Sequence, residues 1–196
     1  MKKLNRTQKI IYLIIIILLL GVFVYVSKKY TREDVEGVKF NDYYKDIDGS
    51  HIDLIFGSEF IKLIDDEDVH VFLIGDRENE WSQKYVELVS SIVNDLGVDI
   101  YYYDIVNDKS QENSNYYRIV KKLNGYLMSD DSSDSNFLSP SLYIIKDGKV
   151  LFYDAETSVV KNSDEVDAYW TEDAEQAFRQ KITAEIHKYV LTIVTQ

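Results

Sequence analysis

The chain has 196 residues, a formal net charge of −12 at pH 7, and no cysteine. Without cysteine it can form no disulfide, no thiolate nucleophile and no cysteine-ligated zinc site. Residues 1–29 hold six basic side chains and no acid, so the remaining 167 residues carry a formal charge of −18. Such a negative field argues against binding nucleic acid, which depends on neutralising phosphates, and against lying flat on anionic lipid.

The first predicted element is an apolar and aromatic run at residues 10–26, just long enough to cross a hydrocarbon core about 30 Å thick. Basic residues dominate before it, whereas acids soon offset those after it, so the positive-inside rule favours a cytoplasmic N-terminus. A cleaved signal peptide is the alternative, but no small-x-small site lies near residues 25–27. We expect a basic cytoplasmic N-terminus at 1–9, a single transmembrane anchor at 10–26, a spacer at 27–45 and an extracytoplasmic domain at 46–196.

Two acidic stretches have a composition that would suit calcium. In the Asp-Ile-Asp-Gly turn at residues 46–49, placing Gly49 at the sixth position of a calcium loop puts Tyr44 and Ile55 where carboxylates are required. We therefore interpret it as a plain turn. The polar insert at residues 129–136 contains three aspartates, and a solvated loop and a calcium site are both compatible with it.

Strands and helices alternate in the predicted domain. The predicted strands are apolar, β-branched or tyrosine-rich segments at residues 52–56, 69–74 and 98–106. The predicted helices have apolar side chains at three-four spacing and occupy residues 59–64, 80–96 and 116–123. Ser58 and Asn79 are the expected N-caps of the first two helices, and Gly97 ends the second. The central strand, 69–74, is apolar enough to be buried on both faces.

The only proline of the chain, Pro140, opens a predicted β-hairpin. Apolar runs at residues 142–145 and 150–153 flank an Asp-Gly turn, which is a strong hairpin signal. A chain that avoids proline elsewhere uses this one for a specific backbone shape, so we predict a cis Ser139–Pro140 bond, with a trans proline at a strand entry as the alternative. Residues 171–194 form a closing amphipathic helix capped by Thr171.

This order of elements, βαβαβα and then ββα, resembles the thioredoxin fold from about residue 51 to the C-terminus. VHVFLIG, at residues 69–75, stands where that family has its central strand, and the next helix begins where the family has its redox motif. SPSLYIIKDGKV, at residues 139–150, is similar to the family's cis-proline, strand, turn and strand. The resemblance implies an α/β fold with a thioredoxin-like mixed sheet flanked by helices, preceded here by the N-terminal transmembrane helix.

A narrower resemblance covers residues 58–88. This stretch is similar to thioredoxin-like proteins of the bacteriocin transport accessory type, in which a CxxC motif is followed by Gln-Lys and an aromatic residue. The sequence Gln83-Lys84-Tyr85 keeps that ending, but Asn79 and Ser82 stand at the two cysteine positions. Dithiol exchange needs a thiolate at the helix N-terminus and a second, resolving thiol. The composition therefore excludes thiol-disulfide oxidoreductase activity.

No other catalytic site is predicted. Ser82 lacks the sequence of a nucleophile elbow. The acids Asp76, Glu78 and Glu80 precede or enter the first helical turn, where acids ordinarily satisfy the helix dipole. We expect no metal and no cofactor, although an enzyme with an unrecognised carboxylate or metal site is a third reading of the chain.

We expect the protein to act by binding a protein or extended peptide partner in the cell envelope. The resemblance implies that the groove between the helix start and the cis-proline loop is lined by Asn79, Glu80, Trp81, Ser82, Ser139 and Pro140. Trp81 is the expected anchor if it is exposed, since tryptophan is enriched in binding hot spots, and the alternative is that it packs into the core. The rival hypothesis is an envelope assembly or bacteriocin-type transport accessory subunit that uses the helices at 10–26 and 171–194 instead of the groove.

Overall fold

The structure, a computed structural model, describes residues 12, 15–16, 18–21, 37–106, 108, 115–123, 139–155 and 165–191. The chain divides into two compact units, residues 1–36 and 37–196. In the first unit the few described residues are helical, and across the described part of the chain no helix combines the length and the apolar character needed to cross a membrane. Most of the predicted anchor and the whole insert at 129–136 lie outside the described residues.

The second unit is built on a five-stranded mixed sheet with the order β1-β3-β2-β4-β5. The strands are β1 Ile52–Ile55, β2 Val69–Gly75, β3 Ile100–Asp104, β4 Ser141–Lys146 and β5 Lys149–Asp154. Strand β3 pairs in parallel with both β1 and β2, whereas β4 runs antiparallel to both β2 and β5. A parallel half joined to an antiparallel hairpin fits the thioredoxin-like sheet that the sequence predicts.

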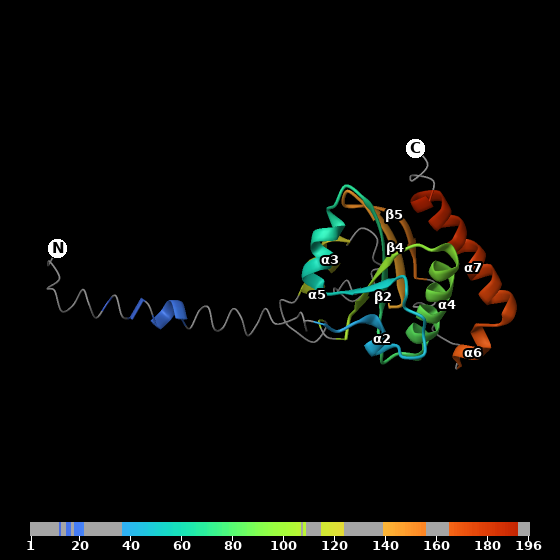
Figure 1. Cartoon of the computed structure of the whole chain (residues 1–196), viewed down its shortest axis with the longest axis horizontal. Helices are drawn as coiled ribbons and strands as arrows, with labels where there is room; N and C mark the ends of the chain where they lie inside the picture. The colour runs from blue at the N-terminus through green and yellow to red at the C-terminus, as the bar shows by residue number, and fades with distance from the viewer. Residues whose placement is uncertain are drawn as a thin grey trace, which may run out of the picture. The chain divides into compact units, whose positions relative to one another are not determined.

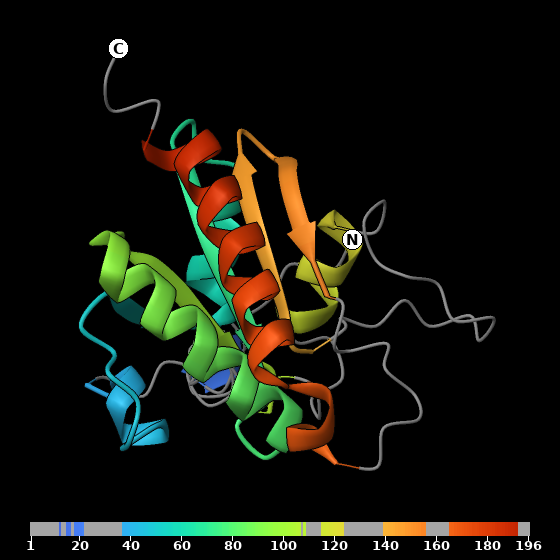
Figure 2. The same cartoon turned by 90° about the vertical axis from the view of Figure 1, so that its right-hand side faces the viewer.

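Helices cover both faces of this sheet (Figure 1). The helices are α2 Phe40–Tyr43, α3 Gly57–Ile64, α4 Glu80–Leu96, α5 Asn115–Lys122, α6 Val166–Tyr169 and α7 Glu172–Ile186, which continues as a π-helix, His187–Leu191. Helices α3 and α5 cover one face, and α4 and α7 lie side by side across the other (Figure 2). The result is a three-layer α/β arrangement.

The central strand β2 contributes to two hydrophobic cores, as its apolar sequence predicts. Val71 and Leu73 point into the core under α4 and α7, and Phe72 and Ile74 point into the core under α3 and α5. Successive side chains of a strand face opposite sides of a sheet. Because helices cover both sides, every position from 71 to 75 is buried.

Three local predictions are confirmed: the hairpin with its cis-proline, the glycine that ends α4 and the threonine that caps α7. The Ser139–Pro140 bond is cis, and Asp147 and Gly148 both have positive φ, as a two-residue hairpin turn requires. Gly97 ends α4 in the left-handed conformation at φ 62°. The Thr171 side chain caps α7 by accepting a hydrogen bond from the backbone N–H of Ala174 at 3.3 Å.

The structure differs from the predicted spacer over residues 37–45. Here Phe40 and Tyr44 are only 1% and 6% exposed, because short helix α2 packs both rings against Tyr102 of the sheet. Helix α2 has only four residues, with one buried aromatic side chain and Tyr44 directly after it, so the segment shows no helical periodicity and its polar composition predicts a spacer. The folded unit therefore begins earlier than the predicted boundary at residue 46.

Two helix details also differ from the prediction. Helix α3 begins at Gly57 with Phe56 as its N-cap residue, so Ser58 is not the cap. A Cβ on Gly57 would lie 2.6 Å from both Asp108 Oδ2 and Asn115 Cβ, so the missing side chain permits this close approach. We also expect Ala177 on the apolar face of the predicted helix at 171–194, but it is exposed. Within the described residues this helix ends in the π-helix His187–Leu191.

Candidate functional site

The site that the sequence predicts lies where β2 leads into α4. Asn79 is the N-cap of α4, and its side-chain oxygen accepts a hydrogen bond from the backbone N–H of Ser82 at 3.1 Å. Such a cap satisfies one of the backbone donors that a helix start leaves without an intrahelical partner. Asn79 and the next residue, Glu80, are exposed. The predicted cap is confirmed, and the amide of Asn79 is used to hold the helix start.

Ser82 is fully buried and has a structural role in the same loop. Its hydroxyl accepts a hydrogen bond from the backbone N–H of Asp76 at 2.7 Å. A Cβ on Gly75 would lie 2.7 Å from the Tyr102 ring and 3.1 Å from the Ser82 hydroxyl, so the end of β2 passes directly against both side chains. The hydroxyl therefore ties the start of the loop to the first turn of α4 and is not presented to solvent.

The histidines that could serve Ser82 as a base have other neighbours. His51 Nδ1 lies 2.7 Å from Asp99 Oδ1, and His70 Nε2 lies 3.6 Å from Asp66 Oδ1. The third, His187, is exposed at the start of the π-helix that follows α7. The geometry gives no support to a serine-histidine nucleophile, and within the described residues no group of three or more metal-ligating side chains could hold a metal ion.

Trp81 is partly buried and takes a position between the two predicted alternatives. Its ring packs against the core under α4 and α7 and meets the ring of Tyr169 of α6 edge-to-face, with the ring centres 5.6 Å apart. An aromatic pair of this kind adds to the stability gained from burial. Trp81 therefore connects α4 to α6 and still leaves part of its surface accessible.

The cis-proline lies beside the same loop. Ser141 pairs with Ile74 in the antiparallel register of β4 and β2, so the Ser139–Pro140 bond lies next to Gly75 and the start of the loop. Pro140 is buried and Ser139 is half-buried. The sheet register thus brings the cis-proline next to the loop that leads into α4, and both Ser82 and Pro140 are buried and offer little of their own surface.

An ion pair with a buried carboxylate, which no sequence motif indicates, anchors the loop from the other side. Arg77 Nη1 lies 2.9 Å from Oδ2 of Asp104, whose side chain is only 2% exposed at the end of β3. The other carboxylate oxygen of Asp104 accepts the backbone N–H of Val106 at 2.8 Å. Burial raises the pKa of Asp104, and the Val106 hydrogen bond and the Arg77 charge oppose this rise. The only sequence signal was that Arg77 is the single cation among the acids of the loop.

Two tyrosine hydroxyls lie close to this ion pair. Tyr44 and Tyr102 share a hydrogen bond of 2.7 Å between their hydroxyl oxygens, and burial raises the pKa of Tyr102 well above its ordinary value. Since Tyr102 also contacts the position of Gly75, this pair connects helix α2 to the end of β2. The loop at residues 76–79 is therefore held by Ser82, Asp104 and the packing beneath it.

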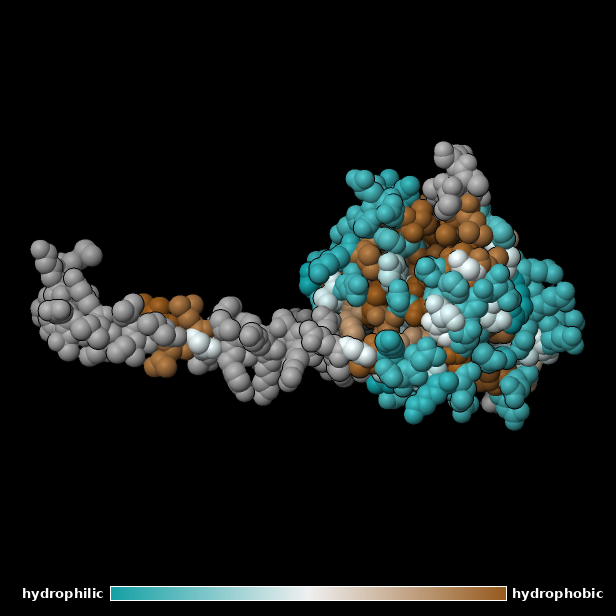
Figure 3. Space-filling model, viewed as in Figure 1, coloured by the Kyte–Doolittle hydropathy of each residue, from teal (hydrophilic) through white to brown (hydrophobic). Residues whose placement is uncertain are grey.

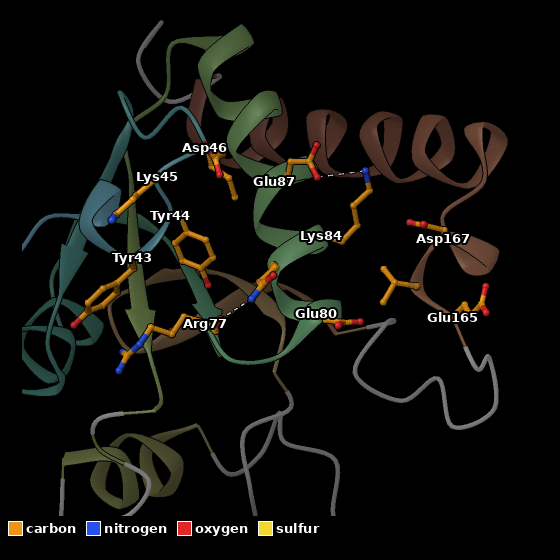
Figure 4. A pocket seen from close by; sticks show the side chains of 13 residues that line it. Tyr43, Tyr44, Lys45, Asp46, Arg77, Glu80, Lys84, Glu87, Glu165 and Asp167 are labelled. Carbon is orange, nitrogen blue, oxygen red and sulfur yellow. Dashed lines mark hydrogen bonds and ion pairs between the residues drawn. The ribbon is translucent and has the colours of Figure 1, made fainter.

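The outer face of α4 borders an open cleft of about 790 Å³ (Figure 4). Residues 43–47 line one side, residues 165–167 line the other, and α4 lies between them with Glu80, Gln83, Lys84 and Glu87. Of the six predicted groove residues, Glu80 alone belongs to this lining. The cleft is thus a different surface from the one that the resemblance predicts.

Comparisons with known proteins give no family assignment. No family model matches the chain. No curated protein matches it either. Among solved structures, the chain is similar to thioredoxin from Fasciola hepatica, with 15% identity over 67% of this chain and 96% of that one and a TM-score of 0.39.

Two further thioredoxins give comparable values. The protein from Trypanosoma brucei brucei has 14% identity over 71% of this chain and 96% of its own, with a TM-score of 0.39. Thioredoxin O2 from Arabidopsis thaliana in the oxidised state has 12% identity over 70% and 99%, with a TM-score of 0.41. The assignment of fold rests instead on the strand order, the strand directions and the cis-proline beside the start of α4. These features describe a thioredoxin-like fold in a chain that has no cysteine.

Proposed function

We propose that this protein is a redox-inactive, thioredoxin-like binding protein, anchored in the cytoplasmic membrane by residues 10–26, with its folded domain outside. The observation that supports it most is the start of α4, where the two residues that the resemblance aligns with the family's cysteines, Asn79 and Ser82, both hold the loop by hydrogen bonds. A thioredoxin-like scaffold is thus combined with a helix cap at Asn79 and a buried hydrogen bond at Ser82, where the family would have its two sulfur atoms. Such a scaffold can recognise a partner without turning it over.

The proposed contact surface is the accessible part of the predicted groove. Asn79 and Glu80 are exposed there, Trp81 and Ser139 are half-buried, and Pro140 is buried beneath them. An extended peptide can bind along such a surface through backbone hydrogen bonds, with an aromatic side chain as its anchor. Ser82, whose hydroxyl faces the interior, contributes by fixing the shape of the loop.

Photocrosslinking in the membrane tests this surface. A photoreactive residue at Glu80 is expected to give a discrete protein adduct that disappears in a folded Trp81→Ala variant. The matched control carries the same probe at Lys62, which is exposed on α3 at the opposite face of the sheet. The same adduct from both positions, or an adduct unchanged by Trp81→Ala, would contradict binding in the groove.

The proposed membrane topology has a separate test, which the absence of native cysteine makes simple. A single cysteine at Lys149, an exposed residue of β5, is expected to react with a membrane-impermeant maleimide in intact cells. A single cysteine at Lys3 is expected to react only after the membrane is opened. Labelling of Lys3→Cys in intact cells would overturn the proposed orientation.

A second proposal is an assembly or transport accessory subunit of the bacteriocin type that uses its helices. What supports it is the Gln83-Lys84-Tyr85 ending, which keeps that subfamily's pattern. In the structure Gln83 donates to the backbone oxygen of Arg77 at 2.7 Å, Lys84 lies 2.9 Å from Glu175, and the buried Tyr85 hydroxyl donates to Asp154 at 2.8 Å. These contacts within the domain explain the Gln83-Lys84-Tyr85 pattern by its role in folding. We therefore prefer the proposal that the partner binds in the groove.

Crosslinking also separates the two proposals. A photoreactive residue at Gln180, exposed on α7, would give the main adduct if the protein acts through its closing helix. The apolar side chains of that helix, Phe178, Ile182 and Ile186, are already buried against the sheet and α4, so any such contact would have to use its charged outer face. An adduct from Glu80 that Trp81→Ala abolishes, with none from Gln180, favours the groove.

A further inference from the structure

The cleft beside α4 has the dimensions of a binding site and is separate from the groove. Its volume of about 790 Å³ falls within the range of roughly 300–1,000 Å³ that is typical of ligand pockets. Trp81, Ser82, Ser139 and Pro140 do not line it. On the face seen in Figure 3, hydrophilic side chains gather over α6 and α7, the side of the domain to which residues 165–167 belong.

Two of the cations that line the cleft are already neutralised. Arg77 is bound to the buried carboxylate of Asp104 at 2.9 Å. Lys84 Nζ lies 2.9 Å from Glu175 and 3.4 Å from Glu87, the latter pair being drawn in Figure 4. These two side chains therefore add no free positive charge to the cleft.

The remaining charges of the lining are mostly acidic. Four exposed carboxylates take part in no side-chain hydrogen bond or ion pair with any residue that the structure describes: Asp46, Glu80, Glu165 and Asp167. They come from three separate segments and lie around one cavity (Figure 4). In the described lining, Lys45 is the one cation that likewise has no such partner. The cleft consequently has a strong local excess of negative charge.

Tyr43, on one wall of the cleft, already makes the kind of contact that a bound cation could make. The Arg77 guanidinium lies over the ring of Tyr43, 4.5 Å from its centre, which is a cation–π contact. Ile47 and Val166 add half-buried apolar surface on the two sides of the cleft. Lysine and arginine side chains combine an apolar stem with a charged end, so they suit walls that alternate apolar surface and carboxylates.

From this arrangement we propose that the cleft binds a segment of a partner protein that is rich in lysine and arginine. A mainly apolar ligand would leave the four carboxylates without partners, and an anionic ligand would be repelled by them. The formal charge of −18 over residues 30–196 attracts a basic partner from a distance and raises its association rate. This site goes beyond the proposed groove and does not depend on the cis-proline loop.

The test uses the full-length chain in nanodiscs of uncharged lipid. Binding of a short fluorescent peptide of alternating lysine and serine is measured by the fluorescence anisotropy of the peptide at low salt. The cleft variant Asp46→Asn, Glu165→Gln, Asp167→Asn is expected to bind about tenfold more weakly than the unmodified chain, as removal of three exposed attractions predicts. The control variant Asp53→Asn, Glu67→Gln, Asp68→Asn removes the same charge from exposed acids that do not line the cleft. It is expected to weaken binding by less than about twofold.

A second readout locates the peptide. A photoreactive version is expected to attach to residues 43–47 or 165–167, and a peptide with glutamine in place of lysine is expected not to bind. Equal weakening by the two variants, attachment at residues 81–82 or 139–140, or no binding to the unmodified chain would each overturn the proposal. Because none of the six substitutions touches residues 79–82 or 139–140, failure here leaves the Glu80 and Trp81 crosslinking result independent.

Discussion

The inner and outer sides of the start of α4 use their polar groups in opposite ways. On the inner side, Ser82 and Asp104 are buried and form hydrogen bonds or an ion pair within the domain. On the outer side, Glu80 and Glu165 are exposed and have no side-chain partner among the described residues. The buried polar groups therefore hold the fold, whereas exposed carboxylates on the outer side, Glu80 among them, are free to meet a partner.

The largest expected effect on the inner side comes from Arg77→Ala. This change leaves the carboxylate of Asp104 buried without its cation or forces it to take up a proton. We expect a loss of about 3 kcal/mol in the free energy of unfolding, measured by urea titration. This value is at the low end of the range for broken buried ion pairs, because Arg77 is partly exposed. Lys45→Ala, a cation of the same cleft with no described partner, is expected to change it by less than about 0.5 kcal/mol. Similar values for the two would mean that the ion pair does not hold the loop.

Ser82→Ala tests the buried hydroxyl at the start of α4. It leaves the backbone N–H of Asp76 without its partner, so we expect a loss of about 1–3 kcal/mol in the same titration. Ser91→Ala is the control in the same helix, because the hydroxyl of Ser91 accepts a bond from the half-buried Arg179. Its expected cost is below about 1 kcal/mol. If Ser82→Ala were the milder change, Ser82 would not be a brace.

Asn79→Ala is expected to cost about 1 kcal/mol, since it removes the N-cap of α4. Asn79→Asp keeps an acceptor in the same place and is expected to cost little or nothing. Thermal unfolding of the three proteins at neutral pH measures both changes. Equal loss in both variants would show that the contribution of Asn79 is not that of a cap.

The pH dependence of stability gives the smallest and most specific effect. Since burial raises the pKa of Asp104 in the folded state, the folded protein keeps a proton that the unfolded chain has already released. The stability of the unmodified chain relative to Asp104→Asn is therefore expected to fall as pH rises above about 4, and to level off above the raised pKa. A relative stability that grows over this range would mean that Arg77 outweighs burial and lowers the pKa.

Sequence patterns that repeat over several residues were sufficient to predict the sheet, the helices that flank it and the hairpin. The apolar run 69–74, the three-four spacing of 80–96 and the Asp-Gly turn each reflect a local requirement of the backbone or of burial. The cis-proline was predictable for a related reason, because a single proline at a strand entry is a strong local constraint.

The rest of the site depends on contacts between distant parts of the chain. The Arg77–Asp104 pair joins residues 27 positions apart, and helix α2 is fixed by the packing of Phe40 and Tyr44 on Tyr102. The cleft needs three segments that the sequence places far apart, from residue 43 to residue 167. No periodicity records such contacts, so the sequence does not predict the open cleft, and the groove formed by residues 79–82 and 139–140 stays a prediction.

The most direct measurement of whether α4 begins a thioredoxin-like site is to restore its sulfur. The double variant Asn79→Cys, Ser82→Cys is expected to form an intramolecular disulfide under mild oxidation and to reduce a disulfide substrate once its own is reduced, because a thiolate at this helix start is stabilised. Each single variant is the control and is expected to do neither. Two thiols that stay free in the folded double variant under oxidising conditions would contradict the equivalence of Asn79 and Ser82 to the family's cysteines.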